Sequence, residues 1–234
     1  GVSGNSVSGF ARANYSYKGK YLLTATFRAD GSSKFGPNNL WGFFPAAAAA
    51  WRISDEAFLE DASDWLSNLK LRLSYGMAGA DNISSSLWRE TWVSGTTKYN
   101  NVLVPTYGPE GLKANPDLKW ETTTQTNLGL DFAFLKNSIY GSFEWYYKKT
   151  KDILVYMPGI AVMGEGSSQW INAGEMENKG IELNLGYRGQ IHDFQYDLSA
   201  NIGTYRNKIT KLPETIAANG TFGGNGVESV VGHP

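Results

Sequence analysis

A period-two alternation of apolar and polar residues runs through most of this chain and constrains its fold more than any other feature. The stretch NLGLDFAFLKNSIYGSFEWYY, residues 127–147, contains two such runs separated by Leu135-Lys136-Asn137. One parity is apolar: Leu128, Leu130, Phe132, Phe134, Ile139, Phe143, Trp145 and Tyr147. The other parity is polar: Asn127, Asp131, Ser142 and Glu144. This pattern predicts a β-hairpin, but it does not say whether the apolar face meets a protein core or lipid.

Similar segments recur along the chain and are joined by connections of very different length. They lie at about 9–17, 21–30, 42–53, 67–79, 119–134, 138–149, 171–188 and 193–208. Short connections are expected at 18–20, 135–137 and 189–193, and a small helical turn with Ser54 as its N-cap within 54–66. Long connections are expected at 31–41, 80–118 and 150–170. We predict an all-β, antiparallel up-and-down meander of about eight strands, a layout that outer-membrane barrels share.

Composition narrows the possible functions. The formal net charge of -1 provides no basic field for nucleic acid, and the chain has no Cys. No run approaches the ~18–20 apolar residues of a membrane helix, whereas spanning by strands stays possible. The two histidines, His192 and His233, have no partner at ligand spacing. We therefore expect no catalytic residues, no metal, no cofactor and no enzyme activity.

The positions of aromatic residues favour lipid for the apolar face. Rings flank the short connections: Tyr15, Tyr17, Tyr21, Trp51, Trp65, Phe132, Phe134, Tyr187 and Phe194. Rings return at the other end of the segments: Phe27, Phe43, Trp145 and Tyr147. Tyr and Trp concentrate at membrane interfaces, and a tilted strand crosses a bilayer in about 9–11 residues. The residues still leave open a soluble β-sandwich that acts as a carbohydrate-binding module, and a small porin or adhesin barrel.

Three stretches carry a family resemblance. YKGKYLLTATFRADGSSKFGPNNLWGFFP (17–45), NPDLKWETTTQTNLGLDF (115–132) and NAGEMENKGIELNL (172–185) resemble signatures of SusC/RagA-like TonB-linked outer-membrane proteins of Bacteroidetes. The matches occur in the order of the family and cover about residues 10 to 210. The resemblance implies that residues 1–234 are one section of a 22-stranded transmembrane barrel. It places the plug domain and the flanking strands outside this sequence.

The resemblance also implies a function. The family imports large nutrients, commonly oligosaccharides or peptides, through the outer membrane of Gram-negative Bacteroidetes. The expected partners are membrane lipid, a SusD-like surface lipoprotein and TonB, which acts through the plug domain. No nucleic acid is expected.

Candidate site residues follow from the two faces and the long loops. We expect these residues to face the barrel lumen: Arg28, Asp30, Arg72, Asn127, Asp131, Glu144, Asn178 and Glu182. We expect these aromatic residues to be exposed on loops and available to substrate: Trp88, Trp92, Tyr99, Tyr107 and Trp170. Aromatic side chains stack on sugar and peptide faces, although loop packing or contact with a lid protein would use the same residues.

Overall fold

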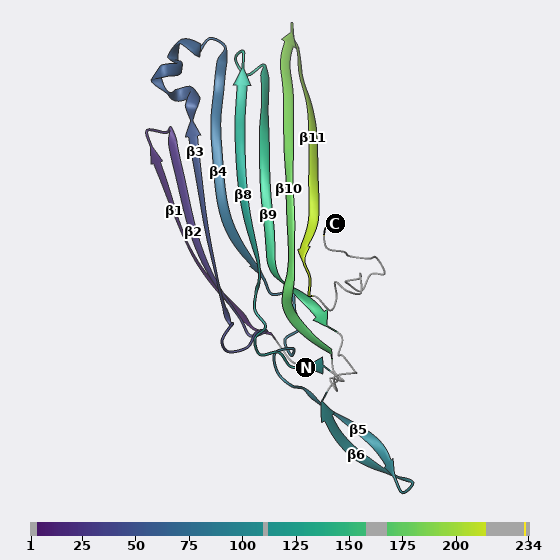
Figure 1. The fold of residues 1–234 in the computed structure, drawn as a ribbon. Helices are drawn as coiled ribbons and strands as arrows, with labels where there is room; N and C mark the ends of the chain where they lie inside the picture. The colour runs from purple at the N-terminus through teal and green to yellow at the C-terminus, as the bar shows by residue number, and fades with distance from the viewer. Residues whose placement is uncertain (1–3, 110–111, 158–167, 214–231, 233–234) are drawn as a thin grey trace.

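One long antiparallel sheet accounts for most of the chain in the computed structural model (Figure 1). The structure describes residues 4–109, 112–157, 168–213 and 232, so His233 lies outside the described residues. The sheet follows chain order: β1 (Ser6–Tyr17), β2 (Tyr21–Ser32), β3 (Trp41–Arg52), β4 (Leu66–Ala80), β8 (Glu121–Phe134), β9 (Ile139–Met157), β10 (Ser168–Ile191) and β11 (Phe194–Lys211). All eight predicted segments are strands, and the predicted meander is confirmed.

The hairpin formed by β8 and β9 shows how the alternation becomes two faces. Leu128 lies opposite Trp145 and Leu130 lies opposite Phe143, so apolar residues share one face across both strands. The turn is at Leu135–Asn137, as predicted, and its three residues have φ of 52°, 56° and 67°. The same register continues into β4 and β10, so over the middle of these strands one face of the sheet is mainly apolar and the other is mainly polar.

The short-turn end carries two 3-10 helices, η1 (Ile53–Asp55) and η2 (Ala57–Ala62). Ser54 is not an N-cap, contrary to the prediction, because η1 begins at Ile53 and places Ser54 inside the helix. Glu56 occupies the N-cap position of η2, and its carboxylate binds back to the sheet instead of to the helix. It accepts hydrogen bonds from Tyr21 Oη at 2.5 Å and Trp51 Nε1 at 3.0 Å.

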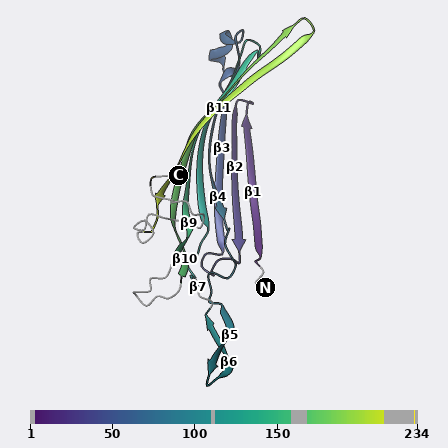
Figure 2. The same ribbon diagram turned by 90° about the vertical axis from the view of Figure 1, so that its right-hand side faces the viewer.

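The long-loop end holds structure that the alternation did not predict. Residues 80–118 contain a separate hairpin, β5 (Trp92–Tyr99) and β6 (Val102–Pro109), which projects beyond the sheet in both views (Figures 1 and 2). β7 (Leu112–Lys113) then pairs in parallel with β10. The hairpin turns at Asn100-Asn101, where φ is 48° and 63°, the conformation of a type I′ turn. Adjacent asparagines tolerate positive φ, so this turn had a signal in the sequence.

The strands reach further than the sequence pattern suggested. β9 continues to Met157 and β10 begins at Ser168, so both ends of the predicted 150–170 loop are strand. At the other end β10 continues to Ile191, which pairs with Phe194, and the turn shrinks to two residues. This tip of β10 and β11 extends past the other turns in Figure 2. With 24 residues, β10 is twice as long as β1.

Most of the buried apolar residues lie at the long-loop end, where loops pack on the ends of the strands. Phe35, Leu118 and Leu154 form a cluster there, and Trp120 and Trp170 pack against it. By contrast, the large side chains on the apolar face of the sheet have no layer over them among the described residues. Examples with their exposed fractions are Leu73 at 52%, Leu198 at 66% and Ile202 at 71%. A β-sandwich formed by the described strands would bury this face, and the observed single sheet does not have that architecture.

Candidate functional site

The centre of the polar face is an arginine that joins three strands. Arg72 on β4 binds Asp131 on β8 through two hydrogen bonds of 2.8 Å, and Glu144 on β9 through one of 2.6 Å. The guanidinium reaches across β8 because Gly129 lies beneath it and has no side chain. A Cβ on Gly129 would be 2.9 Å from Arg72 Cζ. One cation therefore serves two carboxylates, and the cluster keeps a net negative charge.

Further hydrogen bonds cross the strands on both sides of this cluster. Asn127 Nδ2 donates to Ser74 Oγ at 2.9 Å. Towards the short-turn end, Asp197 accepts hydrogen bonds from Tyr140 Oη at 2.6 Å and from Arg188 Nη2 at 2.8 Å. The polar face is thus a hydrogen-bonded surface of mixed charge, a surface that suits contact with water or another polar domain.

All eight residues expected to face a lumen lie on this polar face. The shared face follows from the strand register for Arg28, Asp30, Arg72, Asn127, Asp131, Glu144, Asn178 and Glu182. Within the set, Arg28 pairs with Asp30 at 2.7 Å, and Glu182 lies directly opposite Glu144. The register brings together Arg72, Asp131 and Glu144, whereas the side chains of Asn178 and Glu182 form no hydrogen bond with another described residue.

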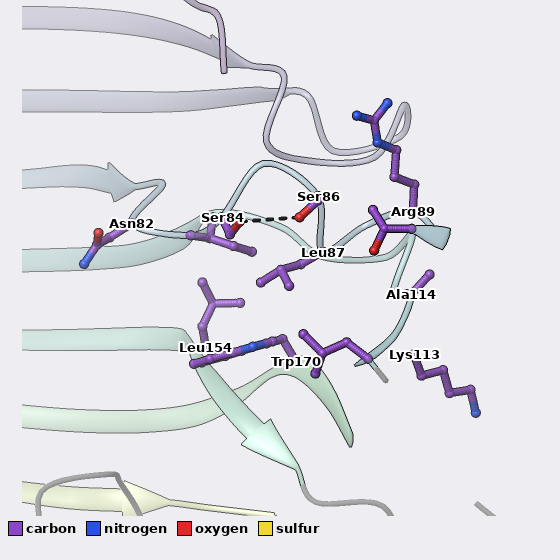
Figure 3. A pocket seen from close by; sticks show the side chains of 12 residues that line it. Asn82, Ser84, Ser86, Leu87, Arg89, Lys113, Ala114, Leu154 and Trp170 are labelled. Carbon is purple, nitrogen blue, oxygen red and sulfur yellow. Dashed lines mark hydrogen bonds between the residues drawn. The ribbon is translucent and has the colours of Figure 1, made fainter. Parts of the chain in front are cut away.

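A pocket opens where the long loops meet the strands (Figure 3). Its volume is about 380 Å³. Leu87, Leu154 and Trp170 point towards one another and form an apolar wall, and the hydroxyls of Ser84 and Ser86 lie 3.5 Å apart at its side. The side chains of Arg89 and Lys113 extend away from the hollow in this view. The pocket offers an aromatic surface and several hydroxyl and amide groups.

A short strap, residues 115–120, lies beside the pocket, since its Leu118 packs in one cluster with Leu154, Leu87 and Trp170 of the pocket wall. The side-chain amide of Asn172 on β10 pairs with the backbone of Lys119 in both directions, with distances of 3.0 and 2.8 Å. Asn115 Nδ2 donates to the carbonyl of Trp170 at 2.8 Å, and Asn39 Nδ2 donates to the carbonyl of Asp117 at 3.1 Å. The three stretches that carry the family resemblance therefore meet at this strap, since Asn39, the strap and Asn172 belong one to each.

The five aromatic residues expected on the loops divide into two groups. Trp92, Tyr99 and Tyr107 lie on the projecting hairpin and are 63%, 69% and 75% exposed. Trp170 is half-buried in the wall of the pocket, where it packs edge-on against Tyr156 with ring centroids 5.5 Å apart. Trp88 is half-buried, with its indole N–H covered, so it is less available than expected.

Sequence reasoning missed most of the pocket. Leu87 and Leu154 are separated by 67 positions in the chain, and neither lies in a recognisable motif. Only Trp170 had a signal, as an aromatic residue beside a long loop. The strap had the family signature but no signal that it would act as a support.

The described residues lack two kinds of functional element. They contain no group of three or more His, Cys, Asp or Glu residues that could hold a metal ion. Among the same residues, no helix is long and apolar enough to cross a membrane.

Comparison with known proteins identifies the family. The family model described as TonB dependent receptor-like, beta-barrel matches residues 1–233. This chain belongs to that family. The TonB-dependent receptor P3 of Formosa agariphila is 40% identical over 217 residues, which are 89% of this chain and 21% of that protein. The TonB-dependent receptor SusC of Bacteroides thetaiotaomicron is 39% identical over 212 residues, 88% of this chain and 21% of that protein.

Solved structures agree on the fold. The RagAB peptide importer in its open-open state superposes with a TM-score of 0.85 at 28% identity and covers 98% of this chain and 24% of that one. The chain spans about a fifth of the length of its curated relatives. As a TonB-dependent receptor barrel segment, the sheet has the architecture that the three stretches implied.

Proposed function

We propose that this chain forms one section of the barrel wall of a TonB-dependent outer-membrane importer. The cargo is a large nutrient such as an oligosaccharide or a peptide. The observation that carries the proposal is the sheet with two different faces and no covering layer among the described residues. Exposed Leu, Ile and Phe side chains suit lipid, whereas the Arg72 cluster suits a polar lumen.

The membrane in this proposal is the outer membrane of a Gram-negative bacterium of the Bacteroidetes. Aromatic rings support this placement because they gather at the short-turn end of the apolar face. Tyr21 stacks on Trp51 with centroids 6.4 Å apart, and Trp65 stacks on Phe134 at 6.0 Å. Such rings anchor a barrel at the interface between lipid and water.

The partners follow from the proposed role. The polar face would surround a plug domain, through which TonB delivers energy. A SusD-like lipoprotein would cover the long-loop end. The RagAB peptide importer supports a partnership of this kind, since this chain resembles its barrel. The projecting hairpin, with Trp92, Tyr99 and Tyr107 exposed, is the part best placed to meet a surface partner.

Substrate contact is proposed for the pocket. Trp170 offers a stacking surface, and the hydroxyls of Ser84 and Ser86 can exchange hydrogen bonds with a sugar or a peptide. In the same proposal Trp88 supports the loop, while Trp92, Tyr99 and Tyr107 contact the substrate or the lid.

Uptake by cells that carry the full-length protein tests the proposal. We expect uptake of labelled oligosaccharide or peptide mixtures to stop when TonB is deleted or the proton gradient is collapsed. Trp170→Ala should weaken uptake about tenfold, on the order of one lost stacking contact. Phe58→Ala is the matched control, because Phe58 is 69% exposed at the opposite end of the sheet. Energy-independent uptake would instead indicate a porin.

A further inference from the structure

The apolar face changes character abruptly along β9, β10 and β11. Residues that lie opposite one another form rows across these strands. One row contains Phe143, Leu183 and Ile202, and the next contains Trp145, Ile181 and Thr204. The following row contains Tyr147, Lys179 and Arg206. On β10 and β11 the side chains therefore change from apolar or neutral to cationic between one row and the next.

Beyond this transition lies a basic patch made of Lys149, Lys179, Arg206 and Lys208. Lys149 binds Glu175 at 3.0 Å and Glu177 at 3.5 Å, and Lys208 lies opposite Glu177. The carboxylates of Glu175 and Glu177 therefore lie beside Lys149 and Lys208, one half of the patch.

Lys179 and Arg206 are left without a carboxylate partner among the described residues. They lie directly opposite each other in the register, and both are exposed. Like charges at opposite positions of neighbouring strands destabilise a sheet. An anion bound between them would remove this repulsion.

The position of the patch indicates where the anion comes from. From the ring of Tyr187 to the charge of Lys179, β10 runs through nine residues, 179–187. This length matches the about 9–11 residues in which a tilted strand crosses the hydrocarbon of a bilayer. Lys179 and Arg206 therefore stand at the second boundary of the lipid, on the long-loop side.

We propose that the basic patch binds the phosphate groups of an outer-leaflet lipid. Arginine presents a fork that matches phosphate geometry, and basic residues beside a membrane attract anionic headgroups. The neighbouring rows with Trp145, Ile181 and Ile202 offer the acyl chains an apolar surface immediately below. Charge and apolar surface thus fit the two parts of one phosphorylated glycolipid, whose phosphates would lie between Lys179 and Arg206. The proposal rests on the outer-membrane placement proposed above.

The experiment uses the full-length protein in phosphatidylcholine nanodiscs. Binding of bisphosphorylated lipid A is measured by native mass spectrometry for the wild type, for Lys179→Gln/Arg206→Gln, and for Lys70→Gln/Lys148→Gln. The control pair removes the same charge from the polar face of the same sheet. We expect the first pair to weaken binding about thirtyfold, the effect of two interfacial charges, and the control pair to leave binding unchanged.

Two further arms make the result specific. The charge-preserving variant Lys179→Arg/Arg206→Lys should retain binding, so a loss caused only by misfolding is recognised. Lipid A without phosphates should bind the wild type about as weakly as the glutamine variant binds the phosphorylated lipid. Equal binding of both lipids by protein that is inserted in nanodiscs would overturn the inference. Complete displacement of lipid A by inorganic phosphate would also overturn the inference, because the patch would then be a site for free phosphate.

Failure of the proposed outer-membrane placement gives a different result. In that case the full-length protein would be absent from outer-membrane fractions and would not insert into nanodiscs. An inserted protein that lacks the lipid preference contradicts only the basic patch.

Discussion

The guanidinium of Arg72 rests on the backbone of Gly129, and this contact allows one side chain on β4 to reach a carboxylate on β9. The intervening strand would block the path if it carried a side chain at that position. The glycine therefore determines how the charges of three strands are connected.

Gly129→Val should displace the guanidinium and separate it from Glu144. Since overpacking and a broken ion cluster act together, we expect the full-length barrel to lose about 1–3 kcal/mol of unfolding free energy. Denaturant unfolding in detergent measures this loss. Gly203→Ala is the control, because a Cβ there approaches its nearest atom only to 3.4 Å. Equal losses in both variants would show that Gly129 has no special role beneath Arg72.

The alternation predicted the faces of the sheet because each strand is long and its parity is uniform. In the hairpin of β8 and β9, even the turn at Leu135–Asn137 was located correctly. The sequence could not predict the hairpin of β5 and β6 in the same way. Its exposed residues, such as Trp92 and Val93, are apolar on both parities, so alternation disappears.

The candidate site also has one part that the sequence predicted and one part that it did not. Strand periodicity placed Asp131 and Glu144 on one face with Arg72, since parity alone determines the face. The pocket needed loops to fold back on strands, and its wall combines Leu87 with Leu154 across the chain. No local pattern encodes such an arrangement, because it depends on how the strap holds the loops.

Asn172→Ala should release the strap. The substitution removes the acceptor of the Lys119 N–H and the donor to the Lys119 carbonyl, at 3.0 and 2.8 Å. Each hydrogen bond contributes about 1 kcal/mol, so amide exchange in residues 115–120 should accelerate tenfold or more. Hydrogen–deuterium exchange of the full-length protein measures this rate directly. Asn172→Asp keeps the acceptor alone and should give an intermediate rate.

Asn201→Ala provides the comparison for this measurement. Asn201 is exposed on β11, and its side chain forms no hydrogen bond with another described residue. Exchange in the strap should not respond to it. If Asn172→Ala also leaves the strap protected, then packing of Leu118 rather than the amide pair holds the segment.

Phe44→Ala should destabilise the long-loop end strongly. Phe44 is 5% exposed, and its ring covers Gly42 and Gly79, where a Cβ would come within 2.4 and 1.9 Å of it. We expect a loss of about 3–5 kcal/mol in unfolding free energy, typical of a buried phenylalanine. Phe43→Ala is the matched control, since Phe43 is the preceding residue, lies on the opposite face and is 58% exposed. Similar losses at both positions would contradict the assignment of Phe44 to a packed core.

Glu56→Gln should alter the acid stability of the short-turn end. The hydrogen bond from Tyr21 and then that from Trp51 lower the pKa of Glu56 below its usual value. A lowered folded-state pKa stabilises the fold above the ordinary carboxyl pKa of about 4.3, and this contribution disappears as pH falls through the folded value. The variant should therefore be less stable than the wild type at pH 7 and nearly equal to it in strong acid.

Thermal unfolding across this pH range makes the comparison. Glu60→Gln is the control, because Glu60 belongs to η2 and its side chain forms no hydrogen bond or ion pair with another described residue. If the difference in melting temperature between Glu56→Gln and the wild type were the same at every pH, the charge of the Glu56 carboxylate would make no contribution to stability.

The length of β10 determines how far the wall formed by the sheet extends beyond the lipid. About 9–11 residues are enough to cross the hydrocarbon, and β10 has 24. Its backbone ladder with β9 and β11 therefore stands free of the membrane over roughly half of its length. In the proposed importer the barrel wall would continue beyond the lipid surface. Cargo would then be enclosed by protein before it reached the level of the bilayer.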